Sequence, residues 1–170
     1  ATSFIQQHYK NFSSMSWVYS CGAGANYGTA LESALKMGET IHIPSCCYEI
    51  EEYIHGPNIQ LTPQYNVIFF DGNDGASRRV EQVYKATRKV TNRAYLISNN
   101  PQLSRDGHVL SLSDTVSSEL SPLVYLPFVQ LLSFIVSNDL HSIYQHPLLK
   151  EFKAIAAAKT ENFVNYDGDD

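Results

Sequence analysis

Apolar positions along the chain fall into short runs that alternate with longer amphipathic stretches. Runs rich in aromatic and β-branched residues predict strands at 16–21, 40–44, 65–71, 94–98 and 108–112. Amphipathic or longer apolar stretches predict helices at 4–12, 25–38, 48–54, 76–91 and 119–140, and Pro127 is expected to bend the last one. Strands that alternate with helices predict an α/β fold, a three-layer sandwich around a mainly parallel five-stranded sheet, with ligands at the carboxyl ends of the strands.

The helix predicted at 25–38 has an apolar and a polar face. Four of its side chains are expected to face the core: Tyr27, Leu31, Ala34 and Leu35. Glu32, Lys36 and Glu39 are spaced to share the polar face. They form either an exposed ladder worth about 0.3–0.5 kcal/mol per pair, or the lining of a crevice in which Lys36 tunes the carboxylates.

Two glycines separate the first predicted strand from this helix. Gly22 and Gly24 permit a tight turn and a close approach of the backbone to an anionic or polar ligand at the helix N-terminus. The third glycine of the dinucleotide-binding fingerprint is missing, which argues against a nicotinamide cofactor.

The stretch from Glu39 to His55-Gly56-Pro57 carries the strongest candidate chemistry. A carboxylate and an imidazole beside one crevice, in the same chain or across a symmetric contact, can share proton transfer. The alternative is that Glu39 caps a solvated helix face and His55 is a turn histidine.

Composition narrows the classes of partner. The chain has 170 residues, of which 44% are apolar, and a net charge of -5, which predicts one domain that binds neither nucleic acid nor an anionic membrane. The longest apolar stretch, 122–136, is short for a membrane span and is interrupted by polar residues, so we expect a buried helix.

The cysteines indicate a reducing compartment. Cys21, Cys46 and Cys47 are odd in number and two are adjacent, so we expect a cytoplasmic protein with buried thiols. The histidines and cysteines lack the spacing of a zinc site, so no metal is expected.

An ordered set of motifs resembles the second sugar-isomerase (SIS) domain of two-domain sugar-phosphate enzymes. The set is Gly-x-Gly, Leu-Glu-x-Ala-Leu-Lys-x-x-Glu and Glu-x-x-His-Gly-Pro, and it begins at Gly22 and ends at Pro57. The resemblance implies a flavodoxin-like SIS domain over 1–147, the second of two tandem lobes, followed by a tail at 148–170. It also implies a homo-oligomer, a dimer, with a second SIS lobe.

The resemblance also implies roles for single residues. Glu39 takes the place of the catalytic carboxylate, which moves a proton between C1 and C2 of an open-chain sugar phosphate. His55 takes the place of the histidine for ring opening and acid–base work, which commonly serves the neighbouring subunit. The residues expected to bind substrate are Gly22, Gly24, Glu32, Lys36 and Glu52. No cofactor is implied.

Three functions stay open within this resemblance. Residues 20–28 and 69–73 look most like deglycases, which convert a 6-phosphofructosamine into a hexose 6-phosphate and an amine. The alternatives are the isomerase domain of a glutamine–fructose-6-phosphate aminotransferase and a non-catalytic regulatory domain. Asp71 and Asp74 disfavour a phosphate in the loop where the family's first lobe holds it, and neither Lys150 nor Lys153 matches the family's tail lysine.

Overall fold

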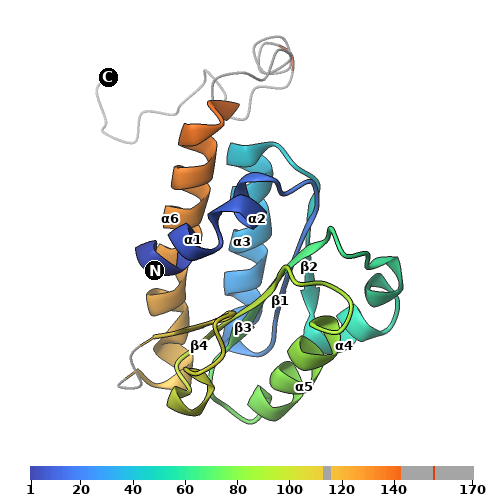
Figure 1. Ribbon diagram of the computed structural model, residues 1–170. Helices are drawn as coiled ribbons and strands as arrows, with labels where there is room; N and C mark the ends of the chain where they lie inside the picture. Colours follow the sequence, from blue (N-terminus) through green and yellow to red (C-terminus); the bar gives the residue numbers. More distant parts are fainter. Residues whose placement is uncertain (113–115, 143–154, 156–170) are drawn as a thin grey trace, which may run out of the picture.

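The protein folds around a parallel sheet, seen in a computed structural model that describes residues 1–112, 116–142 and 155. The five strands are β1 (Val18–Gly22), β2 (Ser45–Glu49), β3 (Asn66–Asp71), β4 (Ala94–Ser98) and β5 (Val109–Ser111). All neighbours pair in parallel in the order β2-β1-β3-β4-β5 (Figure 1). The predicted α/β fold with a parallel five-stranded sheet is confirmed.

Helices cover both faces of this sheet (Figure 1). One face carries α1 (Thr2–Gln7), α2 (Tyr9–Ser13), α3 (Ala25–Ile41) and α6 (Ser121–Asp139). The other carries α4 (Ile50–Ile54) and α5 (Ser77–Thr87). Three short 3-10 helices complete the described part: η1 (Pro57–Gln60), η2 (Pro101–Leu103) and η3 (Ser118–Leu120). The chain reverses its direction of winding between β1 and β3, which is where open sheets of this kind leave a crevice.

The strands β1, β3 and β4 are buried on both faces, and their side chains alternate between two cores. In β3, Ile68 and Phe70 pack toward α3 and α6, whereas Val67 and Phe69 pack toward α4 and α5. This explains why the strands read as continuous apolar runs.

The strand predicted at 40–44 is wrong. The helix α3 continues to Ile41, and β2 begins only at Ser45. The Thr40 hydroxyl donates to the Lys36 carbonyl at 2.7 Å, Ile41 is buried in the core, and His42 ends the helix with φ 63°. Two β-branched residues therefore lie in the last helical turn because tertiary packing outweighs their strand preference.

The predicted core face of α3 is also wrong for its larger residues. Leu31 and Leu35 are 49% and 52% exposed, and Tyr27 is only half-buried. The helix buries mainly smaller side chains, together with Met37 and Ile41, against the sheet and α6: Asn26, Thr29, Ala30, Ser33 and Ala34. Small residues let α3 approach β1 and α6 closely, which turns the leucines outward.

The apolar C-terminal helix α6 continues through Pro127. Together with η3 it covers Ser118–Asp139, which by length and composition is apolar enough to cross a membrane, although 44% of its most apolar window is buried. Its buried side chains include Tyr125, Phe128 and Leu132, and it packs along α3 (Figure 1). The expected buried helix is therefore found at this position.

Two predicted helices and the predicted burial of the cysteines are corrected by the structure, and the predictions for the C-terminal end fall on residues that it does not describe. The helix expected at 4–12 is divided at His8 into α1 and α2, and the helix expected at 76–91 ends at Thr87. Cys21 is buried as expected, but Cys46 is exposed. The domain boundary at 147, Lys150, Lys153 and the acidic end lie outside the described residues.

Candidate functional site

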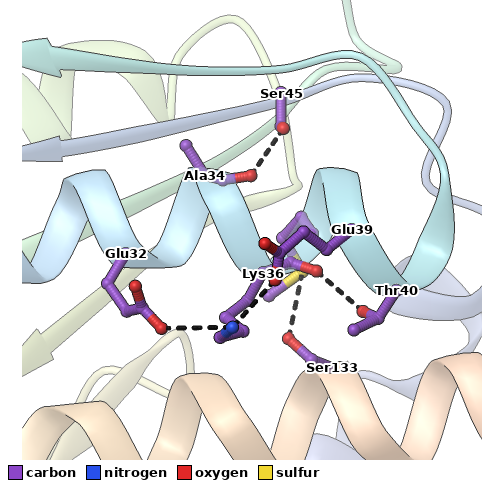
Figure 2. Close-up of polar contacts among 8 residues, drawn as sticks. Glu32, Ala34, Lys36, Glu39, Thr40, Ser45 and Ser133 are labelled. Atoms are coloured by element: carbon purple, nitrogen blue, oxygen red, sulfur yellow. Dashed lines mark hydrogen bonds and ion pairs between the residues drawn. The ribbon is translucent and has the colours of Figure 1, made fainter. Parts of the chain in front are cut away.

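The polar face of α3 forms a row of ion pairs. The Lys36 ammonium lies 2.8 Å from a Glu39 carboxylate oxygen and 3.5 Å from one of Glu32 (Figure 2). The hydrogen bond to Glu39 is the main reason why the pKa of Lys36 is raised, and the nearby charges of both glutamates add to it. Sequence spacing therefore placed these three residues correctly on one face.

A groove of about 560 Å³ lies beside this row, between α3 and β2. Glu39 lines it together with the exposed Leu31 and Leu35, and Ser45 and Cys47 contribute from β2. Ser45 donates to the Ala34 carbonyl at 2.6 Å on the opposite side of α3 from Lys36 (Figure 2). The strand β2 is the edge strand of the sheet, so the groove is open along this edge.

His55 lies on the other face of the sheet from Glu39. It follows α4, whose side chains pack in the core shared with α5, and its N–H donates to the Glu52 carbonyl at 3.1 Å. The pKa of Glu51, in the first turn of α4, is lowered mainly by the hydrogen bonds from Arg79, with a smaller contribution from the nearby His55. Within one copy of the chain, no hydrogen bond or ion pair joins Glu39 and His55, both of which the structure describes.

Glu52 forms part of a capping box at the start of α4. Its carboxylate accepts from the Glu49 N–H at 3.2 Å, while the Glu49 carboxylate accepts from the Glu51 N–H at 2.6 Å. These contacts satisfy backbone donors that would otherwise be unpaired at the helix start. Glu52 therefore has a structural role in addition to any contact with a ligand.

The glycine turn after β1 is built by close packing. A Cβ at Gly22 would lie 2.3 Å from the Asn26 carbonyl oxygen, which leaves no room for a side chain. Gly24 has φ 54° and ψ -132°, a conformation that favours glycine. The turn meets the β3–α5 loop, because a Cβ at Gly24 would lie 3.4 Å from an Asp74 carboxylate oxygen.

The β3–α5 loop satisfies its own polar groups. Buried Asp71 accepts from the Ser98 hydroxyl at 2.7 Å, from the Asn73 N–H at 3.0 Å and from the Ser77 hydroxyl. The Ser77 oxygen in turn accepts from the Asp74 N–H at 2.7 Å. The one hydroxyl of this loop is thus engaged inside it.

Sequence reasoning missed a buried polar contact that closes this end of the sheet. The Asn26 amide donates to the Ser121 hydroxyl at 2.7 Å and accepts from Thr29 at 3.0 Å, and all three side chains are buried. A Cβ at Gly72 would lie 2.9 Å from the Asn26 amide nitrogen. An asparagine in the first helical turn is a weak signal by itself, because its partner lies 95 positions away.

The glycine turn and Glu39 lie at opposite ends of α3. The fourteen steps from Ala25 to Glu39 rise about 21 Å along a helix, which exceeds the length of a six-carbon sugar phosphate. Glu39 lies near the amino end of β2, whereas Gly22 ends β1 at the carboxyl edge. One bound sugar phosphate therefore cannot contact both groups in one copy.

Comparisons with known proteins agree with the fold. No family model matches the sequence. The chain is 28% identical over 125 residues to a glutamine–fructose-6-phosphate aminotransferase (isomerizing) of Xylella fastidiosa, an alignment that covers 72% of this chain and 20% of that protein.

Solved structures with a similar fold include several phosphosugar enzymes. One is a candidate phosphosugar isomerase of Clostridium difficile, with a TM-score of 0.76, 20% identity and coverage of 93% of this chain and 44% of that one. Another is the C-terminal domain of the glucosamine-fructose-6-phosphate aminotransferase of Francisella tularensis, with a TM-score of 0.71, 23% identity and coverage of 81% of this chain and 39% of that one. A third is the tagatose-6-phosphate ketose/aldose isomerase of Escherichia coli, with a TM-score of 0.69, 15% identity and coverage of 82% of this chain and 40% of that one.

The resemblance in the sequence is thus matched by the structural neighbours, and the chain has the fold of phosphosugar isomerases. It spans one fifth of the length of the curated relative and less than half of these solved chains.

Proposed function

We propose that this chain is a SIS domain that supplies Glu39 as the carboxylate for proton transfer on an open-chain sugar phosphate. The observation that carries the proposal is the position of Glu39, which is held by Lys36 at 2.8 Å and borders the groove between α3 and β2. The fold shared with phosphosugar isomerases supports it.

The chemistry requires a base at carbon and a proton source at oxygen. Glu39 would take the proton from C1 and return it to C2, while an acid gives a proton to the oxygen on C2. Lys36 would position the carboxylate, and Glu32 would position Lys36 from the previous helical turn. Proton transfer of this kind uses only side chains, so the proposal invokes neither a metal nor an organic cofactor.

The site would be completed by a second copy or a second lobe. His55 is the proposed acid–base partner. Because it lies on the opposite face of the sheet from Glu39, we propose that it acts in the site of a neighbouring subunit. A symmetric dimer would then build two such sites at once. Gly22, Gly24 and Glu52 lie toward the carboxyl edge, and we propose that they contact a sugar phosphate bound there rather than the one at Glu39. A cytoplasmic setting fits a soluble sugar phosphate.

For the substrate we propose a 6-phosphofructosamine. Moving one proton from C1 to C2, and a second from the nitrogen to the C2 oxygen through the acid–base group, converts the ketoamine into the Schiff base of a hexose 6-phosphate. Water then adds to C1 and the C1–N bond breaks, which releases the hexose 6-phosphate and the amine. The alternative substrate is fructose 6-phosphate, as in the related reaction of an isomerizing aminotransferase. The similarity of the sequence to such an aminotransferase supports this alternative.

A second candidate function is a regulatory domain that binds a sugar phosphate without turnover. The specific observation in its favour is the β3–α5 loop, where Asp71 and Asp74 use the loop's own donors and add negative charge. Such a loop is a poor phosphate cradle, because phosphate prefers free N–H groups and hydroxyls. It therefore counts against turnover in this domain, and a regulatory sugar phosphate would have to bind elsewhere on its surface.

The test compares Glu39→Gln with Glu81→Gln in the full assembly to which this domain belongs. Glu81 is the matched control, because it pairs with Lys85 on α5 just as Glu39 pairs with Lys36 on α3. We expect Glu39→Gln to lower the release of hexose 6-phosphate from a 6-phosphofructosamine by about 100-fold or more, and Glu81→Gln to leave it unchanged. Equal activity of the two variants would remove Glu39 from the reaction.

Calorimetry separates the two candidate functions. For the enzyme lobe, the 170-residue chain alone should bind fructose 6-phosphate poorly and turn nothing over, and binding should appear only with the second lobe and a second copy. Micromolar binding by a monomer of this chain, without turnover in any assembly, would instead favour the regulatory domain.

A further inference from the structure

The groove between α3 and β2 holds two leucines beside the carboxylate of Glu39. Leu31 and Leu35 are both about half exposed, and both line the groove together with Glu39. The three residues follow one another at intervals of four along α3, so Leu35 lies one helical turn from Glu39 and Leu31 lies a further turn away, about 12 Å along the helix. An apolar strip therefore leads away from the proposed base.

The other side chains of this groove offer little to a sugar hydroxyl. The Ser45 hydroxyl donates to the Ala34 carbonyl at 2.6 Å, so this donor is already used within the protein (Figure 2). A Cβ at Gly38 would lie 3.1 Å from the Ser45 oxygen, so α3 and β2 approach each other closely there. Burial is the main reason why the pKa of the Cys47 thiol is raised to about 11, and the uncharged thiol behaves as a small apolar group. Of the side chains that line the groove, Glu39 alone carries a charge.

The nitrogen of the proposed substrate has a substituent that suits such a strip. In a 6-phosphofructosamine the nitrogen is bonded to C1, the carbon from which Glu39 would take a proton, so the substituent begins beside Glu39. The sugar carbons continue from C2 and would lie toward the charged row of Lys36 and Glu32, where hydroxyls find polar partners. A carboxylate on the substituent would lie close to Glu39 and be repelled, and Lys36 is already paired with two carboxylates. The groove therefore favours a substituent that is both apolar and uncharged.

We infer that the groove binds an apolar, uncharged substituent on the nitrogen of the substrate, and that Leu31 and Leu35 determine this specificity. The inference rests on the proposed function, because it takes Glu39 as the base at C1. The volume of about 560 Å³ lies within the range of roughly 300–1,000 Å³ for small-molecule sites. A bound alkyl group would remove the apolar surface of both leucines from water, which favours an apolar amine over a hydroxylated one.

The test compares the 6-phosphofructosamines of hexylamine and of diglycolamine, an amine of equal length in which two oxygens replace carbons. In the full assembly to which this domain belongs, Leu35→Gln should lower kcat/KM for the hexylamine substrate about tenfold and leave kcat/KM for the diglycolamine substrate unchanged. Each substrate is compared with itself, so the difference in basicity between the two amines cancels. Leu123→Gln changes another exposed leucine, on α6 and outside the groove, and as the control it should alter neither rate.

A binding measurement separates this specificity from turnover. The reduced Schiff bases of glucose 6-phosphate with the two amines cannot react, and calorimetry should show that the assembly binds the hexylamine compound about tenfold more tightly. Leu35→Gln should remove this preference.

The inference is overturned if the two reduced compounds bind equally to the unaltered assembly, or if Leu35→Gln leaves the ratio of the two kcat/KM values unchanged. An equal loss for both substrates, together with altered sedimentation, would also overturn it and would place the leucines in a contact between subunits. Turnover retained by Glu39→Gln would instead contradict the proposed function, whatever the two amines show.

Discussion

The two ends of α3 differ in what they do for the molecule. At the N-terminal end, Gly22 and Gly24 fit where no side chain or only a strained one can, and the buried Asn26 is hydrogen-bonded to Ser121 of α6. The C-terminal half carries Lys36 and Glu39 at the surface, beside an open groove. One helix thus joins a constrained turn to an exposed charged row.

The difference separates residues that the fold requires from residues that it leaves free. At the N-terminal end, a larger side chain clashes with the backbone, and a smaller one leaves a buried polar group without a hydrogen-bond partner, so substitution lowers stability. At the C-terminal end, the charged side chains are in contact with solvent, so a substitution of similar size changes the free energy of unfolding little. Charged residues that the fold does not require are the better candidates for function.

The largest effect is expected for Gly22→Val. The new Cβ would lie 2.3 Å from the Asn26 carbonyl oxygen, and the backbone must move to admit it. We expect a loss of about 3 kcal/mol in the free energy of unfolding, measured by urea denaturation. Gly28→Ala is the control, because nothing lies within 4 Å of that position and it is helical, so alanine should stabilise by about 0.5–1 kcal/mol. Equal midpoints for the two variants would contradict the close packing of the turn.

Asn26→Ala should have the next largest effect. It leaves the buried Ser121 and Thr29 hydroxyls each without one partner, at a cost of about 1–3 kcal/mol. A double-mutant cycle with Ser121→Ala isolates the contact between α3 and α6, and we expect a coupling energy of about 0.5–3 kcal/mol. Additive effects would mean that the two side chains do not act as a pair.

A smaller effect is expected for Gly24→Ala. The added methyl group has ordinary contacts, with Asp74 at 3.4 Å, so the cost comes from φ 54° and should be about 1–2 kcal/mol. Gly75→Ala is the matched control in the neighbouring loop, since its surroundings are open and its φ is not positive. If both substitutions leave the melting temperature unchanged, the turn does not need glycine at position 24.

The fold was predictable because the central strands β1, β3 and β4 are buried on both faces. Apolar runs such as Asn66–Asp71 have little alternative to a central strand once helices separate them. The strand expected at 40–44 failed for a local reason: Thr40 and Ile41 have strand propensity, but the packing of Ile41 in the core keeps them helical.

The candidate site was predictable only in part. The spacing of Glu32, Lys36 and Glu39 fixed their common face, since helical geometry alone decides it. The outward position of Leu31 and Leu35 was not predictable, because α3 packs through its smaller side chains. The relation between Glu39 and a partner's His55 depends on chains beyond this one and stays a prediction.

The smallest effect is expected for Lys36→Met. This variant tests whether the stability of the fold depends on the charged residues at the C-terminal end of α3. The ammonium is about one-third exposed and its pairs with Glu32 and Glu39 are at the surface, so the loss should be about 0–1 kcal/mol after screening by solvent. Lys85→Met, which breaks the pair with Glu81 on α5, is the control and should behave alike.

The pH dependence of this small loss follows from the raised pKa of Lys36, whose main cause is the hydrogen bond to Glu39. The folded state holds the proton more tightly than the unfolded state, so the ion pair stabilises fully below the ordinary value of 10.5 and is lost as the pH rises through the higher folded value. The difference in unfolding free energy between the unaltered chain and Lys36→Met should therefore stay constant from about pH 7 to 9 and vanish at higher pH. A loss as large as that of Gly22→Val, or one unchanged above the folded pKa, would show that Lys36 holds the fold together, and the contrast between the two ends of α3 would fail.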